Sequence, residues 1–254
     1  METNIRITGE AGQGVQTVGD LITRAFAEMG LHVFTTQSYM SRIRGGVNST
    51  DIRISNAELF SAREDCDLLV ALNEESASFH IGSVSPGGAV ISTTDMAAEG
   101  AKALKIDFDS EARLSGGSNR MGNSVAAGAV FAAIGADISF LEKVFESHFT
   151  THGGGRIAEA NIACARAGAR IASNMKKTIK FPALDPAAFP FVISGSEIIA
   201  LSALISGVKV VSSYPMTPST GVFTELASLA DEFGAVVEQA EDEIAAINIV
   251  CGAA

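Results

Sequence analysis

The sequence has no tryptophan, only three cysteines and few aromatic residues, and these scarcities exclude several classes of protein. Cys66, Cys164 and Cys251 lie far apart without a CxxC pair, so we expect no zinc site, iron–sulfur site or disulfide framework in this chain. The longest apolar runs are interrupted too early to span a bilayer. The first residues resemble a strand rather than a signal peptide. We therefore expect a cytoplasmic protein without a membrane span.

The sequence also has few positively charged residues. The chain carries 18 Lys and Arg against 29 Asp and Glu, which gives a formal net charge of −11. An acidic surface repels phosphate groups, so neither nucleic acid nor an anionic membrane is expected as a non-specific partner. By contrast, 47% of the 254 residues are hydrophobic and 25 are glycine. A chain of this kind can bury a large core, and its small residues favour helices packed closely on a sheet.

Strand-like and helix-like segments alternate along the chain, which predicts an α/β fold with a mostly parallel sheet and helices on both faces. Alternating or continuous apolar runs predict strands at 5–8, 32–36, 50–54, 67–71, 88–92 and 208–211. Helical periodicity predicts helices at 15–29, 123–134, 138–149, 161–174 and 197–206.

A change of composition after residue 175 predicts a domain boundary. A basic segment is followed by Pro182, Pro186 and Pro190 at even spacing, which is typical of an extended linker. We predict a first domain over residues 1–175, a linker over 176–190 and a second α/β unit over 191–254. The second unit is too short for a complete helix-covered parallel sheet, so we expect it to be the opening of a larger domain.

A glycine-rich turn and two arginines are candidate anion-binding features of the first domain. Gly12 and Gly14 lie between a predicted strand and helix, where glycine lets the backbone approach a phosphate at the helix N-terminus. Their spacing differs from GxGxxG, so a tight packing turn is the commoner explanation. The interpretation of this chain as a nucleotide-binding dehydrogenase would depend on this turn alone. Arg42 and Arg44 could bind phosphate or carboxylate, although surface arginines beside a glycine turn are frequent.

The segment YPMTPST (214–220) follows the last predicted strand, where open α/β sheets bind ligands. The hydroxyl groups of Thr217 and Ser219 could hold a small anionic substrate. Alternatively, or in addition, Ser219 or Thr220 caps the helix that follows.

Three acids among alanines, Glu241, Asp242 and Glu243, form the last candidate site. On one helix they cannot all face the same way, so we expect one to point to the alanine-rich side. A carboxylate buried there is costly without a partner, and a cofactor ring nitrogen could be that partner. From composition alone, a solvated face would explain two of the three.

Together these segments resemble the 2-oxoacid:ferredoxin oxidoreductases, and more narrowly the 2-oxoglutarate-type α subunits that carry a fused N-terminal γ domain. Residues 1–175 are similar to the γ domain in GEAGQGV (9–15), YMSRIRGGVNSTDIRIS (39–55) and NRMGNSVAAGA (119–129). Residues 191–254 resemble the start of the thiamine-diphosphate (pyrimidine-binding) domain in ISGSEIIALSALISGV (193–208), SYPMTPST (213–220) and EQAEDEIAAIN (238–248).

The resemblance implies roles for particular residues in the oxidative decarboxylation of a 2-oxoacid, with 2-oxoglutarate favoured, to an acyl-CoA. Glu243 matches the glutamate that hydrogen-bonds N1′ of the thiamine aminopyrimidine, and Thr217 matches a threonine that contacts the substrate. The same motif makes Tyr214 and Pro215 candidate cofactor-binding residues. The phosphates of coenzyme A are the best candidate ligand for Arg42 and Arg44, and Gly12 and Gly14 are further cofactor-binding candidates.

The resemblance also implies partners. A separate β subunit is expected to carry a 4Fe–4S cluster and to bind the diphosphate and Mg²⁺, in a dimer of αβ units that passes electrons to ferredoxin. Family α subunits continue well beyond 254 residues, so we expect no turnover from this length of chain alone. The alternative is a non-catalytic module, derived from the same family, that binds coenzyme A or assembles subunits.

Overall fold

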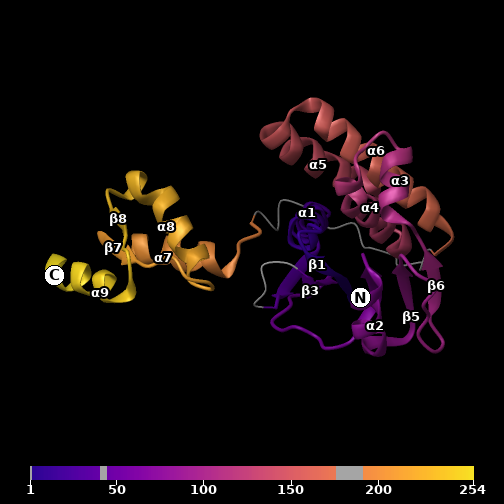
Figure 1. Ribbon diagram of the computed structural model, residues 1–254, viewed down its shortest axis with the longest axis horizontal. Helices are drawn as coiled ribbons and strands as arrows, with labels where there is room; N and C mark the ends of the chain where they lie inside the picture. Colours follow the sequence, from indigo (N-terminus) through magenta and orange to yellow (C-terminus); the bar gives the residue numbers. More distant parts are fainter. Residues whose placement is uncertain (1, 41–44, 176–190) are drawn as a thin grey trace. The chain divides into compact units, whose positions relative to one another are not determined.

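A computed structural model describes residues 2–40, 45–175 and 191–254, and internal contacts divide the chain into two compact units, Met1–Pro190 and Phe191–Ala254 (Figure 1). The predicted linker, 176–190, and both candidate arginines, Arg42 and Arg44, lie outside the described residues. The predicted domain boundaries therefore stay a prediction.

The first unit is built on a six-stranded sheet in the order β2-β3-β1-β4-β5-β6. The pairs β1–β4, β4–β5 and β5–β6 are parallel, whereas β1–β3 and β2–β3 are antiparallel. The predicted α/β fold with a mostly parallel sheet is confirmed, but β2 and β3 add an antiparallel edge to it. The strands are β1 (Glu2–Ala11), β2 (His32–Ser38), β3 (Gly45–Ser55), β4 (Cys66–Ala71), β5 (Val84–Ser92) and β6 (Lys102–Lys105).

The main core of this unit lies between one face of the sheet and a layer of helices. Ile5 and Ile7 alternate along β1 with polar residues and pack into this core, as the two-residue period of a strand requires. Phe26 of α1 stacks on Phe131 of α4 with ring centroids 4.8 Å apart. The helices of the unit are α1 (Val15–Glu28), α2 (Glu74–His80), α3 (Phe108–Leu114), α4 (Gly122–Ile134), α5 (Ile138–Gly153) and α6 (Gly155–Ala172). Short 3-10 turns at Ile81–Ser83, Asn119–Met121 and Ser173–Met175 complete it.

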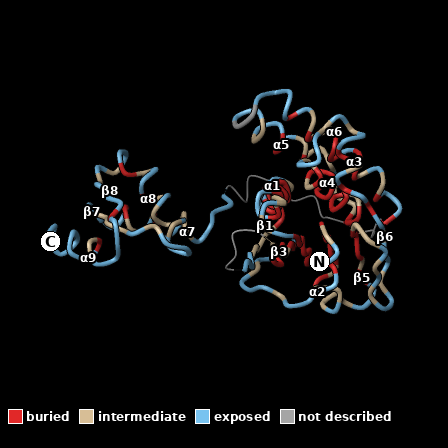
Figure 2. The backbone as a smooth tube through the Cα atoms, in the orientation of Figure 1, coloured by how far each residue is buried: buried red, intermediate tan, exposed pale blue. Residues whose placement is uncertain are grey.

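Glycine makes a close helix crossing possible in this layer. A Cβ atom on Gly128 of α4 would collide with the backbone of Ala165, and one on Gly168 of α6 would collide with the backbone of Val125. The two helices therefore pack backbone to backbone. This contact explains why α4 is buried over almost its whole length (Figure 2).

A polar network occupies the opposite face of the sheet, where Figure 1 shows α2 on the other side from α1 and α4. Arg6 of β1 forms a buried ion pair with Asp51 of β3, with Nε 2.7 Å from Oδ1, and donates to Ser83 Oγ at 2.8 Å. Arg6 Nη1 also lies 3.4 Å from His80 Nδ1, which must accept because a guanidinium only donates. Burial and the neighbouring Arg6 lower the pKa of His80 to about 4. Burial raises the pKa of Asp51, although Arg6 opposes the shift.

The second unit is small. Its elements are α7 (Gly195–Ile205), β7 (Val210–Ser213), α8 (Thr220–Phe233), β8 (Val236–Gln239) and α9 (Glu243–Ala253), and β7 and β8 form a two-stranded parallel sheet. Ser194 and Glu197 form a capping box at the start of α7. Ala200, Leu204 and Leu226 are the centre of a compact core between α7 and α8.

Many apolar side chains of the second unit are exposed. On α9, Ile244 is 73% and Ile247 is 60% exposed, and in Figure 2 most of this unit is drawn as intermediate or exposed. Two parallel strands rarely make a stable sheet by themselves, so these surfaces fit the prediction that residues 191–254 are part of a larger domain. Within the described residues, no helix is both long enough and apolar enough to cross a membrane.

Candidate functional site

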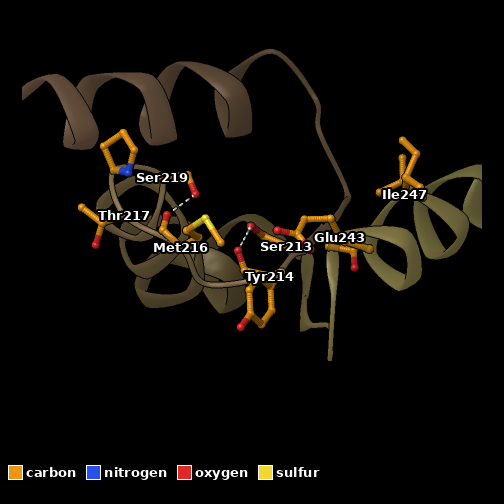
Figure 3. Close-up of a pocket in the computed structure, with 11 residues that line it drawn as sticks. Ser213, Tyr214, Met216, Thr217, Ser219, Glu243 and Ile247 are labelled. Atoms are coloured by element: carbon orange, nitrogen blue, oxygen red, sulfur yellow. Dashed lines mark hydrogen bonds between the residues drawn. The ribbon is translucent and has the colours of Figure 1, made fainter. Parts of the chain in front are cut away.

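A pocket of about 430 Å³ lies at the carboxyl ends of the parallel strands β7 and β8, where the loops leading into α8 and α9 begin. Figure 3 shows Tyr214 and Met216 of the first loop near Glu243 at the start of α9. We call this cavity the Glu243 pocket. It is lined by Ser212, Ser213, Tyr214, Met216, Thr217, Pro218, Ser219, Glu243, Ala246, Ile247 and Val250.

The pocket brings together four of the residues singled out in the sequence: Tyr214, Thr217, Ser219 and Glu243. Pro215 belongs to the same loop but is not among the residues that line the cavity. Glu243 is the first residue of α9 and the others belong to the loop after β7. They meet because the carboxyl ends of neighbouring parallel strands share one edge of a sheet.

The loop between β7 and α8 is closed by its own hydrogen bonds. The backbone N–H of Met216 donates to the Tyr214 carbonyl, and the N–H of Ser219 donates to the Met216 carbonyl, both at 2.9 Å. Ser219 Oγ donates to the same Met216 carbonyl at 2.7 Å (Figure 3). Ser219 is the N-cap residue of α8, as one of the two alternatives predicted, but its side chain makes no capping hydrogen bond and its hydroxyl closes the loop instead.

The three acids do not share a helix, so the prediction that assumed one was wrong. Glu241 precedes α9, Asp242 is its N-cap, and only Glu243 lies within it, as its first residue. Asp242 Oδ1 accepts a hydrogen bond from the backbone N–H of Ala245 at 2.6 Å. Glu243 is exposed rather than buried among alanines, and it faces the pocket together with Ala246 and Ile247. A capping acid thus fixes the helix end from which the pocket acid projects.

The hydroxyl groups around the Glu243 pocket are not equally engaged. Ser213 Oγ donates to the Tyr214 carbonyl at 3.3 Å, and Ser219 is engaged as described. Ser212 Oγ, in contrast, is buried and has no hydrogen-bond partner among the described residues. Sequence reasoning missed Ser212, because nothing in a short strand pattern marks which serine faces a cavity.

A second pocket, of about 260 Å³, lies in the first unit, and we call it the Arg120 pocket. Helices α1, α4 and α6 contribute lining residues close to their N-termini, and none of the three has a side-chain cap or an acid in its first turn. Its lining contains no acidic side chain: Thr17, Val18, Leu21, Ser118, Arg120, Met121, Asn123, Ser124, Phe145, Phe149, Ile157 and Asn161. Arg120 was not singled out in the sequence, although it stands in the NRMGNS segment used for the resemblance.

The predicted glycine turn lies beside this pocket. Gly12 and Gly14 both have positive φ, +95° and +73°, which favours glycine at each position. Gly14 is the N-cap residue of α1, and the Asn123 side chain of the Arg120 pocket lies against it, leaving no room for a Cβ atom. The turn therefore has a packing role in joining α1 to α4.

Comparison with known proteins separates the same two regions. Residues 4–171 match the family model described as pyruvate ferredoxin/flavodoxin oxidoreductase. The chain belongs to this family. Residues 202–254 match a second model, described as pyruvate flavodoxin/ferredoxin oxidoreductase, thiamine diphosphate-binding, which includes the whole Glu243 pocket.

Relatives within the pyruvate ferredoxin/flavodoxin oxidoreductase family confirm the resemblance to 2-oxoacid:ferredoxin oxidoreductase α subunits. The 2-oxoglutarate oxidoreductase subunit KorA of Mycobacterium tuberculosis is 27% identical over 98% of this chain and 44% of its own length. The 2-oxoglutarate synthase subunit KorC of Archaeoglobus fulgidus is 29% identical, but over 69% of this chain and 91% of its own length. The part of this chain that matches KorC is thus about the size of the first unit. This chain spans about half the length of KorA.

Solved structures agree. One is the 2-oxoglutarate:ferredoxin oxidoreductase from Magnetococcus marinus, solved with 2-oxoglutarate, coenzyme A and succinyl-CoA bound. The match covers 99% of this chain and 45% of the chain in that structure, with a TM-score of 0.86 and 29% sequence identity. The γ subunit of a keto/oxoacid ferredoxin oxidoreductase from Geobacter sulfurreducens covers 67% of this chain with a TM-score of 0.57. At 24% identity it supports the fold only.

The residues of the Glu243 pocket fit the ring of thiamine diphosphate. A carboxylate, an unpaired hydroxyl and apolar side chains line one cavity, which suits a flat heteroaromatic ring with a polar edge. For a metal, the described residues contain no group of three or more His, Cys, Asp and Glu side chains that could hold an ion.

Proposed function

We propose that this chain is the γ–α portion of the α subunit of a cytoplasmic thiamine diphosphate-dependent 2-oxoacid:ferredoxin oxidoreductase, which oxidatively decarboxylates a 2-oxoacid to an acyl-CoA. The observation that carries the proposal is the meeting of Glu243, Thr217 and Tyr214 in one pocket at the carboxyl edge of β7 and β8. 2-Oxoglutarate is the favoured substrate, since KorA and the Magnetococcus marinus enzyme both carry that name.

Each residue has a defined task in this proposal. Glu243 hydrogen-bonds the N1′ edge of the aminopyrimidine and exchanges a proton there, and Asp242 fixes the helix end that presents it. Thr217 offers a hydroxyl to the anionic substrate, and Tyr214 and Met216 provide part of the apolar surface of the pocket. When bound, thiamine diphosphate supplies the carbon nucleophile and the electron sink that a protein side chain cannot.

The Arg120 pocket is the best-placed candidate in the described first unit for coenzyme A, whose phosphates and adenine need a cation and an apolar surface. Arg120 and Asn123 are among its lining residues, and Phe145, Phe149 and Leu21 supply apolar surface. Helix N-termini without acids add favourable potential for an anion. Gly12 and Gly14 would then act by shaping the turn beside the pocket, and Arg42 and Arg44 are proposed as further phosphate ligands.

The remaining chemistry is assigned to partners. A β subunit would carry the 4Fe–4S cluster, bind the diphosphate through Mg²⁺, and deliver electrons to ferredoxin from a dimer of αβ units. The naming of relatives as separate subunits, such as KorC, supports a multi-subunit enzyme.

The test is an assay of the full-length α chain assembled with its β subunit. A panel of 2-oxoacids should reduce ferredoxin in a reaction that requires both thiamine diphosphate and coenzyme A, with 2-oxoglutarate giving the highest kcat/KM. Turnover without coenzyme A would contradict the acyl-CoA product. Binding of coenzyme A without any turnover would instead support a non-catalytic module.

A further inference from the structure

Four buried side-chain atoms in the described part of the chain have no hydrogen-bond partner: Asn4 Oδ1, Ser76 Oγ, Thr94 Oγ1 and Ser212 Oγ. Folded proteins satisfy most such groups, so each exception calls for an explanation. Only Ser212 among the four lines a pocket that contains a candidate catalytic residue, Glu243. We propose that the Ser212 hydroxyl is a cofactor-binding group that hydrogen-bonds the polar edge of the aminopyrimidine ring in the Glu243 pocket.

The strand decides where Ser212 points. Successive side chains of a strand face opposite sides, and Val211 packs against the core between α7 and α8, beside Val237 of β8. Ser212 therefore faces away from that core, toward the side where the residues of α9 complete the pocket wall. Strand β7 thus lies between the apolar core and the Glu243 pocket, and Ser212 is the last residue of the strand on the side opposite Val211.

The neighbouring hydroxyls have other tasks. Ser213 and Ser219 donate to backbone carbonyl groups of the loop, and the geometry of the loop depends on them. Ser212 is the hydroxyl in this lining that is both buried and without a partner in the described chain. It can donate one hydrogen bond and accept others, so it suits a ring edge that combines ring nitrogen acceptors with an exocyclic amino donor.

This inference rests on the proposed function, because it takes thiamine diphosphate as the occupant of the Glu243 pocket. It adds to the proposed cofactor site a residue of β7, whereas Glu243 belongs to α9. A ring contacted from β7 by Ser212 and from α9 by Glu243 is fixed in its plane at two points, whereas Glu243 alone would leave it free to pivot. Ser212 therefore sets both the affinity for the cofactor and the alignment of its ring with the carboxylate.

The experiment measures the Kd of thiamine diphosphate, in the presence of Mg²⁺, for the cofactor-free enzyme assembled from the full-length α chain and its partner. Ser212→Ala should raise the Kd about three- to tenfold, which is the value of one neutral hydrogen bond. Ser212→Thr keeps the hydroxyl and should bind within about twofold of the parent protein, since a strand tolerates a β-branched side chain. Ser76→Ala is the matched control, because it removes another buried, unpartnered hydroxyl from outside this pocket and should leave the Kd unchanged.

A second readout separates a binding role from a structural one. Without cofactor, Ser212→Ala should keep or raise the melting temperature, because it removes a buried polar group that has no partner. An unchanged Kd in Ser212→Ala, or a fall in melting temperature that Ser212→Thr reverses, would overturn the inference. If the parent enzyme does not bind thiamine diphosphate at all, the proposed function itself fails. Binding by the parent with equal affinity in Ser212→Ala refutes the role of Ser212 alone.

Discussion

Glu243→Gln is the most informative single change in the Glu243 pocket. Glutamine keeps the size and polarity of the side chain, but it cannot accept and return a proton at N1′ as a carboxylate can. The structure shows that nothing in the described fold depends on this carboxylate: Glu243 is exposed, and the cap of α9 is made by Asp242. The variant should therefore fold and assemble normally.

The expected loss of activity follows from the proton transfer. A positioned acid–base group contributes about 10²–10⁴-fold to a rate, which corresponds to roughly 2.7–5.4 kcal/mol of transition-state stabilisation. In the assembled enzyme, kcat for the preferred 2-oxoacid should fall by about that factor. The KM for the 2-oxoacid should change much less, because Glu243 is assigned to the cofactor rather than to the substrate.

Two neighbouring acids provide matched controls. Asp242→Asn should retain near-normal kcat, because asparagine caps a helix as well as aspartate does. Glu241→Gln lies outside α9 and does not line the pocket, so it should also be close to normal. The assay is steady-state turnover of all three variants at saturating thiamine diphosphate, with occupancy of the cofactor measured separately. Near-normal turnover of a fully loaded Glu243→Gln enzyme, or a larger loss in either control, would show that the wrong acid was assigned.

Three further predictions concern the fold. Gly128→Ala should destabilise the protein by about 1–3 kcal/mol in chemical denaturation, because its methyl group would meet the α6 backbone. A Cβ atom at Gly155 would have nothing within 4 Å, so Gly155→Ala should change the free energy of unfolding by no more than about 0.5 kcal/mol. Equal effects of the two substitutions would refute the close crossing of α4 and α6. The pKa of His80 falls from 6.5 to about 4 on folding, so the unfolded chain binds more protons between these values and the free energy of unfolding should drop as the pH falls through that window. The loss due to His80 should be about 1–2 kcal/mol for a partly screened group, and His80→Asn should abolish that part of the pH dependence. Limited proteolysis should cut between residues 174 and 191, and preferential cleavage within 1–174 would contradict the predicted boundary.

The pattern of apolar residues was sufficient to predict most of the elements. The helix predicted at 15–29 is α1, and the strand predicted at 67–71 is β4 with one residue added. The missed elements include α2, α3, β6 and β8, each with too few residues for a period to be read. The strand predicted at 88–92 is longer in the structure, because β5 begins at Val84 and includes the Pro-Gly-Gly sequence at 86–88.

In the Glu243 pocket, too, some features were predicted from the sequence and others were not. Tyr214, Thr217 and Glu243 were identified in the sequence from motifs that resemble the family. The position of each acid relative to the helix was not, because a cap depends on where the backbone leaves the extended conformation. Hydrogen-bond geometry made Asp242 the cap of α9, and the lining of the cavity contains Glu243.

The sequence by itself determined the alternation of strands and helices, the glycine turn before α1 and the acidic and hydroxyl motifs of the second unit, since these depend on neighbours along the chain. Tertiary structure alone decided which side chains meet. The Arg120 pocket joins α1, α4, α5 and α6, and the buried hydroxyl of Ser212 has meaning only once α9 lies beside β7. The physical reason is that propensity and periodicity are local, whereas a cavity and an unpaired polar atom are defined by surfaces that residues far apart in sequence bring together.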